Sequence, residues 1–110
     1  MKVMISQPMQ GKSHVHILEE RERLVQMLEN EGYEVVDSVI ARKPPEDAKD
    51  ALWYLGESLK VMATCDAVFF MPGWQEARGC RIEHAAADAY GLAIYTEASA
   101  GDHEFLIVED

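Results

Sequence analysis

The sequence predicts an α/β fold in which helices cover both faces of a four- to five-stranded parallel sheet. Short apolar runs alternate with segments of helical periodicity along the 110 residues. The run 67–71 contains no polar residue and ends at Pro72-Gly73, as expected for a strand that is buried on both faces. Such alternation is typical of right-handed βαβ crossovers and of a three-layer sandwich. We expect one domain over residues 1–110.

The first part of the chain predicts two strands with a helix between them. Residues 3–5 are a short apolar strand, and residues 33–37 form the second strand. Helical spacing predicts a helix over 14–31, ended by Gly32. The residues expected to form its apolar stripe are Val15, Leu18, Leu24, Val25 and Leu28. Charged residues within 19–23 are expected to be solvated.

The middle of the chain predicts an irregular segment and a second helix. Pro44-Pro45 excludes a helix or a central strand within residues 38–50. That loop is either an ordinary surface loop, a lid over the site or part of a subunit contact. A helix over 51–64 is expected to turn Leu52, Leu55, Leu59, Val61 and Met62 toward the sheet.

The last part of the chain predicts a further helix and one or two strands. Good helix formers run over 80–90, with apolar residues at helical spacing, and Gly91 ends the helix. Residues 92–95 read as the fourth strand, whereas 105–108 are either a fifth strand or an apolar tail that docks on a neighbour. The expected strand order is 2-1-3-4, which places a crevice between the first and third strands at their carboxyl ends.

Composition and charge exclude several classes of partner. The net charge is −10, from 20 acidic and 10 basic residues. Such a field repels nucleic-acid polymers and anionic membranes, so a bound mononucleotide would need a locally different potential. The two cysteines form no disulfide framework. No signal peptide and no membrane-length apolar run is present, and we expect a cytoplasmic protein.

Metal and cofactor chemistry has little support in the sequence. His14 and His16 are two residues apart, so on a helix they point in different directions and make a poor metal pair. The loop 6–11 is neither a Walker loop nor a dinucleotide fingerprint. We therefore expect no metal and no cofactor.

Glu83 is the strongest candidate for chemistry. It lies in the first turn of the helix predicted over 80–90, where the helix dipole should keep its carboxylate ionised at neutral pH. An ionised, positioned carboxylate suits a nucleophile that attacks an electron-poor sugar carbon. A first-turn glutamate also stabilises a helix without any catalytic role, and position alone leaves both interpretations open.

Two loops converge on the same crevice. They are 6–11, after the first strand, and 72–79, after the third. The residues that we expect to bind a substrate there are Ser6, Pro8, Met9, Gly11, Gly73, Trp74, Arg78 and Gly79.

Three stretches carry a resemblance to a known family. ISQPMQG at 5–11, Asp66-Ala67-Val68 and GCRIEHA at 79–85 resemble the nucleoside 2-deoxyribosyltransferase-like superfamily, close to a phage- and prophage-associated branch of unknown function (DUF4406-like). The resemblance covers nearly the whole chain. It implies a flavodoxin-like or Rossmann-like fold, a homodimer or homotetramer, and action on a 2′-deoxyribonucleoside or its 5′-monophosphate.

The resemblance also implies roles for single residues. Glu83 matches the glutamate that attacks C1′ of the sugar, after which the glycosyl group passes to water or to another base. Glu76 and His84 are the candidates for the acid that protonates the leaving base, and His84 has the right chemistry near neutral pH. Asp66 begins the third strand and is therefore expected at the edge away from the site.

Recognition of a 5′-phosphate departs from the family pattern. Nucleotide-cleaving relatives offer serine and arginine in the first loop, where this chain has Pro8 and Gln10. Lys12, Arg78 or Arg81 would then have to replace them.

Two other functional interpretations are open. The chain is either a nucleoside- or nucleotide-binding module without turnover or, less in keeping with the convergent polar residues, a purely structural oligomer. If the protein is an oligomer, we expect the interface between its subunits at Trp53, Tyr54 and residues 105–108.

Overall fold

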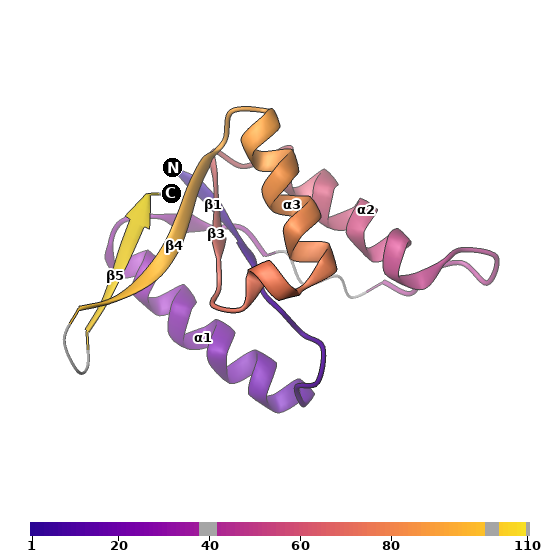
Figure 1. Ribbon diagram of the computed structural model, residues 1–110, viewed down its shortest axis with the longest axis horizontal. Coiled ribbons are helices and arrows are strands. Elements are labelled where there is room, and N and C mark those ends of the chain that lie inside the picture. The colour runs from indigo at the N-terminus through magenta and orange to yellow at the C-terminus, as the bar shows by residue number, and fades with distance from the viewer. Residues whose placement is uncertain (38–41, 101–103, 110) are drawn as a thin grey trace.

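The computed structural model describes residues 1–37, 42–100 and 104–109 (Figure 1). Strands, helices and one short 3-10 helix alternate along the chain. In order they are β1 (Lys2–Ser6), α1 (His14–Asn30), β2 (Glu34–Val35), α2 (Asp50–Met62), β3 (Ala67–Phe70), η1 (Trp74–Glu76), α3 (Arg78–Ala89), β4 (Ala93–Ala100) and β5 (Glu104–Glu109).

The strands form one sheet in the order β2-β1-β3-β4-β5. The first four are parallel, which confirms the predicted α/β class and the order 2-1-3-4. The fifth strand exists, but it runs antiparallel to β4. Only residues 101–103 separate β4 from β5, and a parallel pair would need a crossover of a dozen or more residues.

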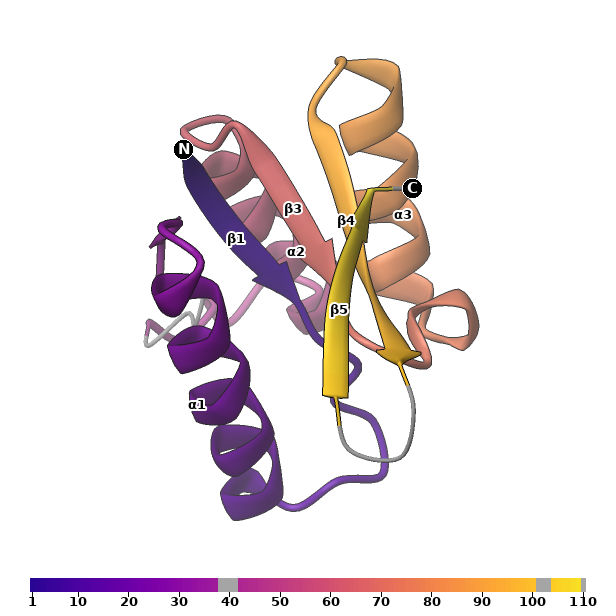
Figure 2. The same ribbon diagram turned by 90° about the vertical axis from the view of Figure 1, so that its left-hand side faces the viewer.

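The helices make the outer layers of a three-layer sandwich. Figure 2 shows α1 against one face of the sheet and α2 and α3 against the other. Because side chains alternate across a strand, β1 and β3 contribute to both cores. Under α1 the core comprises Val3, Ile5, Leu24, Leu28, Ala67, Phe69 and Met71. Under α2 and α3 it comprises Met4, Met62, Cys65, Val68, Phe70, Ala87 and Ile94.

The predicted apolar stripe of α1 is wrong in its first two turns. Leu24 and Leu28 are fully buried, but Val15 is 63% exposed and Leu18 is also exposed. The first turns of α1 extend past the carboxyl ends of the strands, so no sheet lies beneath them (Figure 2). Leu52 near the start of α2 was likewise expected to face the sheet, and it is 63% exposed.

Glycines end the helices where the sequence predicted. Gly32 follows α1 with φ 92°, and Gly91 follows α3 with φ 75°. Both values lie in the left-handed region, which a residue with a Cβ rarely adopts.

None of the helices within the described residues combines the length and the hydropathy that a membrane crossing requires.

Candidate functional site

A cavity of about 790 Å³ opens at the carboxyl edge of the sheet, at the predicted crevice between β1 and β3. Its walls come from the end of β1 and the loop that follows, from α1, from α2, and from η1 and the start of α3. Its polar and charged lining includes Ser6, Gln7, Arg21, Glu76, Arg78 and Glu83. Segments far apart in the sequence therefore line the same cavity.

Glu83 lies on the face of α3 that packs against the sheet. Cys80, Glu83 and Ala87 are the buried residues of this helix, at spacings of three and four. Because α3 begins at Arg78, Glu83 lies in the second turn of the helix, and the predicted first-turn position is wrong. Its side chain lines the cavity and is 9% exposed.

Burial changes the protonation of Glu83. Loss of solvent raises the pKa of its carboxyl from 4.5 to about 7, and the nearby Ser6 hydroxyl offsets this only in part. Near pH 7 about half of the molecules therefore carry a proton on Glu83. The expectation that the helix dipole would keep the carboxylate ionised is wrong, because the dipole acts mainly within the first turn and burial dominates.

Ser6 ends β1 at the base of the cavity and is 1% exposed. Its hydroxyl lies close enough to Glu83 and Cys80 to lower the pKa of both, yet it makes no hydrogen bond of normal geometry with any described residue. Burial is the largest effect on Cys80 and raises the pKa of its thiol. The thiol is therefore protonated at neutral pH and is a poor nucleophile.

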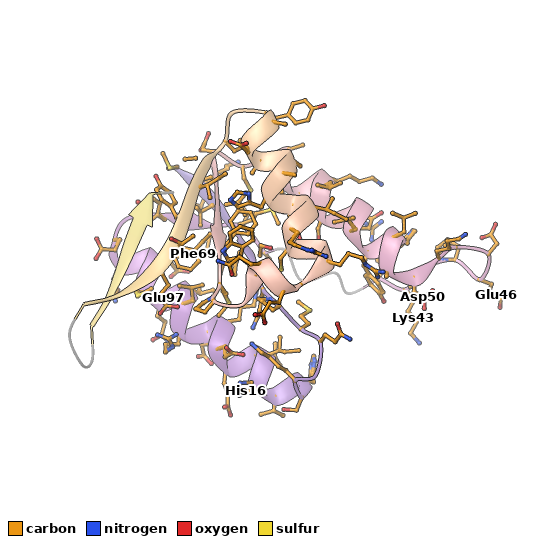
Figure 3. All side chains as sticks on the ribbon, viewed as in Figure 1. His16, Lys43, Glu46, Asp50, Phe69 and Glu97 are labelled. Atoms are coloured by element: carbon orange, nitrogen blue, oxygen red, sulfur yellow. The ribbon has the colours of Figure 1, made fainter. Side chains whose placement is uncertain are left out.

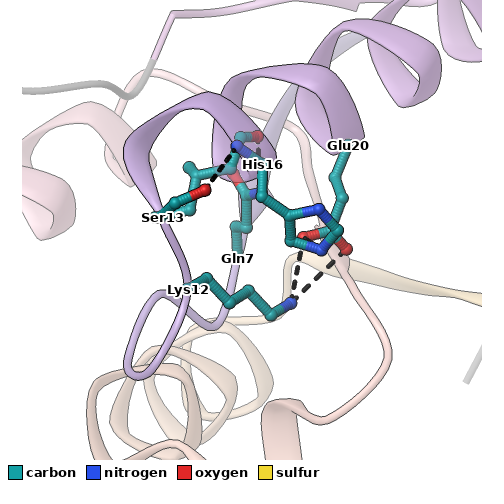
Figure 4. Close-up of polar contacts among 6 residues, drawn as sticks. Gln7, Lys12, Ser13, His16 and Glu20 are labelled. Atoms are coloured by element: carbon teal, nitrogen blue, oxygen red, sulfur yellow. Dashed lines mark hydrogen bonds and ion pairs between the residues drawn. The ribbon is translucent and has the colours of Figure 1, made fainter.

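Gln7 supplies a second buried oxygen without a partner. Its Nε2 donates to the carbonyl of Ile17 at 2.9 Å (Figure 4), which fixes the orientation of the amide because a carbonyl accepts only a donor. Its Oε1 is then left without a partner among the described residues. Two buried oxygens beside one cavity are unusual in a folded protein and indicate a site for a ligand.

Arg21 is a charged side chain of the cavity that sequence reasoning missed. The run 19–23 was predicted to be solvated, but Arg21 is 8% exposed and lines the cavity from α1. Burial lowers the pKa of its guanidinium, and the charge of Asp37 acts in the opposite direction. The signal was present, since Arg21 precedes Leu24 by three residues and shares its face of the helix.

The structure brings together five of the eight predicted substrate-binding residues. The lining includes Ser6, Pro8, Met9, Arg78 and Gly79. Gly11, Gly73 and Trp74 lie outside it. Gly11 has φ 80°, and a Cβ there would meet no atom within 4 Å, so its glycine serves the turn and not a close contact.

His84 lies outside the cavity lining although Glu83 lies within it. Successive residues on a helix point about 100° apart. The His84 ring stacks on Trp74 with 4.2 Å between ring centroids and an interplanar angle of 7°, and it also contacts Phe70. Glu76, the other predicted acid, does line the cavity.

Two further charged residues have other partners. Lys12 makes an ion pair with Glu20 at 3.1 Å and does not line the cavity (Figure 4). Asp66 accepts a hydrogen bond from the backbone N–H of Lys2 at 2.8 Å. Asp66 precedes β3 and thus lies at the edge of the sheet opposite the cavity, as predicted.

The described part of the proline-containing loop lies against α2. Arg42 makes an ion pair with Glu57, and its guanidinium stands 5.9 Å from the centroid of the Trp53 ring. No residue of 42–49 lines the cavity. Lys43 and Glu46 lie toward the far end of the molecule in Figure 3. The lid prediction for residues 38–41 falls outside the described residues.

Within the described ranges, no group of three or more His, Cys, Asp or Glu side chains could hold a metal ion. His16 lies beside Glu20, with 3.3 Å between Nε2 and Oε1 (Figure 4).

Comparison with known families decides part of the identity. The family model of a domain of unknown function, DUF4406, matches residues 1–96. The chain belongs to this family. No curated protein matches the sequence. The DUF4406 match includes every residue of the cavity and ends within β4, so β5 lies beyond it.

Proposed function

We propose that this DUF4406 protein cleaves the N-glycosidic bond of a 2′-deoxyribonucleoside or its 5′-monophosphate, or transfers the base, with Glu83 as nucleophile. The observation that carries the proposal is a buried carboxyl inside a cavity at the carboxyl edge of a parallel sheet. Ligands of such folds bind at this edge. The volume of about 790 Å³ is ample for a nucleoside.

The reaction would proceed in two steps. A carboxylate oxygen of Glu83 forms a bond to C1′ while the C1′–N bond breaks, and the bonding electrons leave with the base nitrogen. That nitrogen takes a proton from Glu76 or from water, since Glu76 lines the cavity and His84 does not. Water or an acceptor base then attacks C1′, loses a proton and releases the Glu83 carboxylate.

Incubation with a panel of deoxyribonucleosides and their 5′-monophosphates, with chromatography of the free base, tests this proposal. Glu83→Gln should reduce base release by several orders of magnitude, because the amide has nearly the same shape but cannot attack. Residual activity within about tenfold of the parent would reject Glu83 as the nucleophile. Glu76→Gln tests the other proposed role, and it should lower the rate about 10²–10⁴-fold if Glu76 is the acid.

The ionised form of Glu83 is the reactive one. With its pKa raised to about 7, kcat/KM should increase as the pH rises through 7 and level off about one unit above. A rate that is flat between pH 5.5 and 8.5 would contradict this assignment.

A binding module without turnover is the second candidate. The partly protonated Glu83 and the position of His84 outside the cavity favour it. A ligand-dependent increase in Tm without release of base would support this alternative. Either function is consistent with the cytoplasmic location that we propose.

A further inference from the structure

The cavity differs in charge from the rest of the molecule. The chain carries a net charge of −10, but three arginines line the cavity against two carboxyls. The arginines are Arg21, Arg78 and Arg81, and the carboxyls are Glu76 and Glu83. The lining is therefore positive even when both carboxyls are ionised, and Glu83 is only partly so near pH 7. A positively charged cavity in an otherwise acidic protein favours an anionic ligand.

The three arginines approach from opposite sides. Arg21 extends from α1, which covers one face of the sheet, whereas Arg78 and Arg81 lie in the first turn of α3 on the other face (Figure 2). The N-terminal end of a helix adds positive potential to the side that holds Arg78 and Arg81. Guanidinium groups bind phosphate oxygens in a paired geometry that lysine cannot match.

Arg21 is the arginine of the three whose charge is buried, since the residue is 8% exposed. It occupies the face of α1 that otherwise buries Leu24 and Leu28. Asp37 is the charged group that offsets the loss of solvent around the guanidinium, and it is itself exposed. A buried charge next to a cavity gains from an opposite charge placed inside that cavity.

The buried oxygens at the base of the cavity are suited to bind ligand hydroxyl groups. Gln7 Oε1 can only accept a hydrogen bond, and it has no partner among the described residues. Ser6 Oγ can accept or donate, and it lies near Glu83 and Cys80 without a hydrogen bond of normal geometry to a described residue. A fully ionised phosphate has no proton to give to Gln7, whereas a sugar hydroxyl has one. The arginines therefore favour an anionic group, and the base of the cavity favours a sugar hydroxyl. A sugar phosphate carries both groups on one ligand.

We propose that the cavity selects the deoxyribonucleoside 5′-monophosphate over the free nucleoside, with Arg21 as the residue that recognises the phosphate. The sugar and base in this statement rest on the proposed function. The preference for the phosphate rests on Arg21, Arg78 and Arg81 and does not require turnover.

Calorimetric titration of the full chain with one deoxyribonucleoside and with its 5′-monophosphate tests the inference. The monophosphate should bind at least tenfold more tightly, and its affinity should fall as salt increases. Inorganic phosphate and 2-deoxyribose 5-phosphate are the further probes, and the sugar phosphate should bind more tightly than phosphate alone. Equal affinity for nucleoside and monophosphate in the parent protein would overturn the inference without any variant.

Variants then assign the role of Arg21. Arg21→Gln should weaken monophosphate binding about 10- to 100-fold, as expected for loss of a charged hydrogen bond, while nucleoside affinity stays within about twofold. Arg21→Lys should recover part of the loss. Arg23→Gln is the matched control, because Arg23 lies on the same helix, pairs with Glu97 at 3.3 Å and does not line the cavity. An equal loss for both ligands in folded Arg21→Gln would give Arg21 a structural role only.

A second variant covers the case in which Arg21→Gln does not fold. Arg78 and Arg81 are exposed at the start of α3, so the double change to glutamine should leave Tm nearly unaltered and still weaken monophosphate binding. Unchanged affinity there would contradict a phosphate site between the two helices. Selective binding of the monophosphate without base release would reject the proposed function and keep this inference. Base release with equal affinity for nucleoside and monophosphate would keep the proposed function and reject this inference.

Discussion

At the scale of single residues, the site depends on polar groups that are buried at a cost. Glu83 is a carboxyl on the face of α3 that packs on the sheet, and Ser6 and Gln7 each bury an oxygen without a partner among the described residues. Groups of this kind lower the stability of the free protein and are usually retained because a ligand completes them. The cost at Glu83 can be measured through its pH dependence.

Glu83→Gln should stabilise the protein at high pH. Below about pH 4.5 Glu83 is protonated in both states, and between 4.5 and 7 only the unfolded chain loses the proton, so stability falls as the pH rises. The raised pKa corresponds to about 3 kcal/mol at pH 8. Urea unfolding at pH 8 and pH 4.5 should therefore show a gain in the variant that is larger by about 2–3 kcal/mol at pH 8.

Glu76→Gln is the control for the loss of one carboxyl charge, since Glu76 lies nearby and is exposed. A gain of equal size at both pH values in Glu83→Gln would show that side-chain packing, and not protonation, causes the effect.

At the scale of elements, the start of α1 fixes one wall of the cavity. Ser13 is the N-cap of this helix, and its Oγ accepts a hydrogen bond from the His16 backbone N–H at 3.2 Å (Figure 4). Lys12 makes an ion pair with Glu20 on the following turn, and His16 contacts the same carboxylate. These contacts hold the helix end that extends beyond the sheet and carries few core contacts of its own.

Ser13→Ala should cost about 1 kcal/mol of unfolding free energy, the usual value for removing an N-cap. It should also weaken ligand binding, because the first turns of α1 line the cavity. Gln26→Ala, at an exposed position on the same helix, should change neither quantity. Urea unfolding and calorimetry would measure both, and a change below about 0.3 kcal/mol would show that the cap is not needed for this helix.

The sequence predicted which residues share a face but not how far each helix overlaps the sheet. The alternation of strands and helices was enough for the strand order, because parallel crossovers are right-handed. Helical spacing grouped Val15 and Leu18 with Leu24, yet only the position of the sheet decides that the first two are exposed.

The same limit explains what was missed at the site. Glu83 and the converging loops followed from the topology. The burial of Arg21 and the protonation of Glu83 depend on the depth of a cavity that four separate segments build, and local patterns carry no measure of that depth.

At the scale of the whole molecule, apolar side chains remain exposed around the cavity. They are Met9, Val15, Leu18, Leu52, Tyr54 and Ile82. All six belong to the loop after β1 or to the three helices, on the side where the helices begin. Trp53, the other expected interface residue, is instead half-buried and packs edge-to-face on Tyr54 with 5.2 Å between ring centroids. We therefore expect the interface between subunits to form at these six exposed apolar side chains, and not at Trp53.

We predict a symmetric homodimer or homotetramer that covers Leu52 and Tyr54. Light scattering at micromolar concentration should give a mass of two or four chains, and a species of 12.4 kDa would contradict assembly. Leu52→Glu should shift the protein toward monomer, because it places a charge in a contact that we expect to be apolar. Tyr90→Glu is the matched control, since Tyr90 is 86% exposed and follows the last turn of α3, away from the cavity. Loss of assembly in Tyr90→Glu, with Leu52→Glu unchanged, would place the interface at the opposite edge of the sheet.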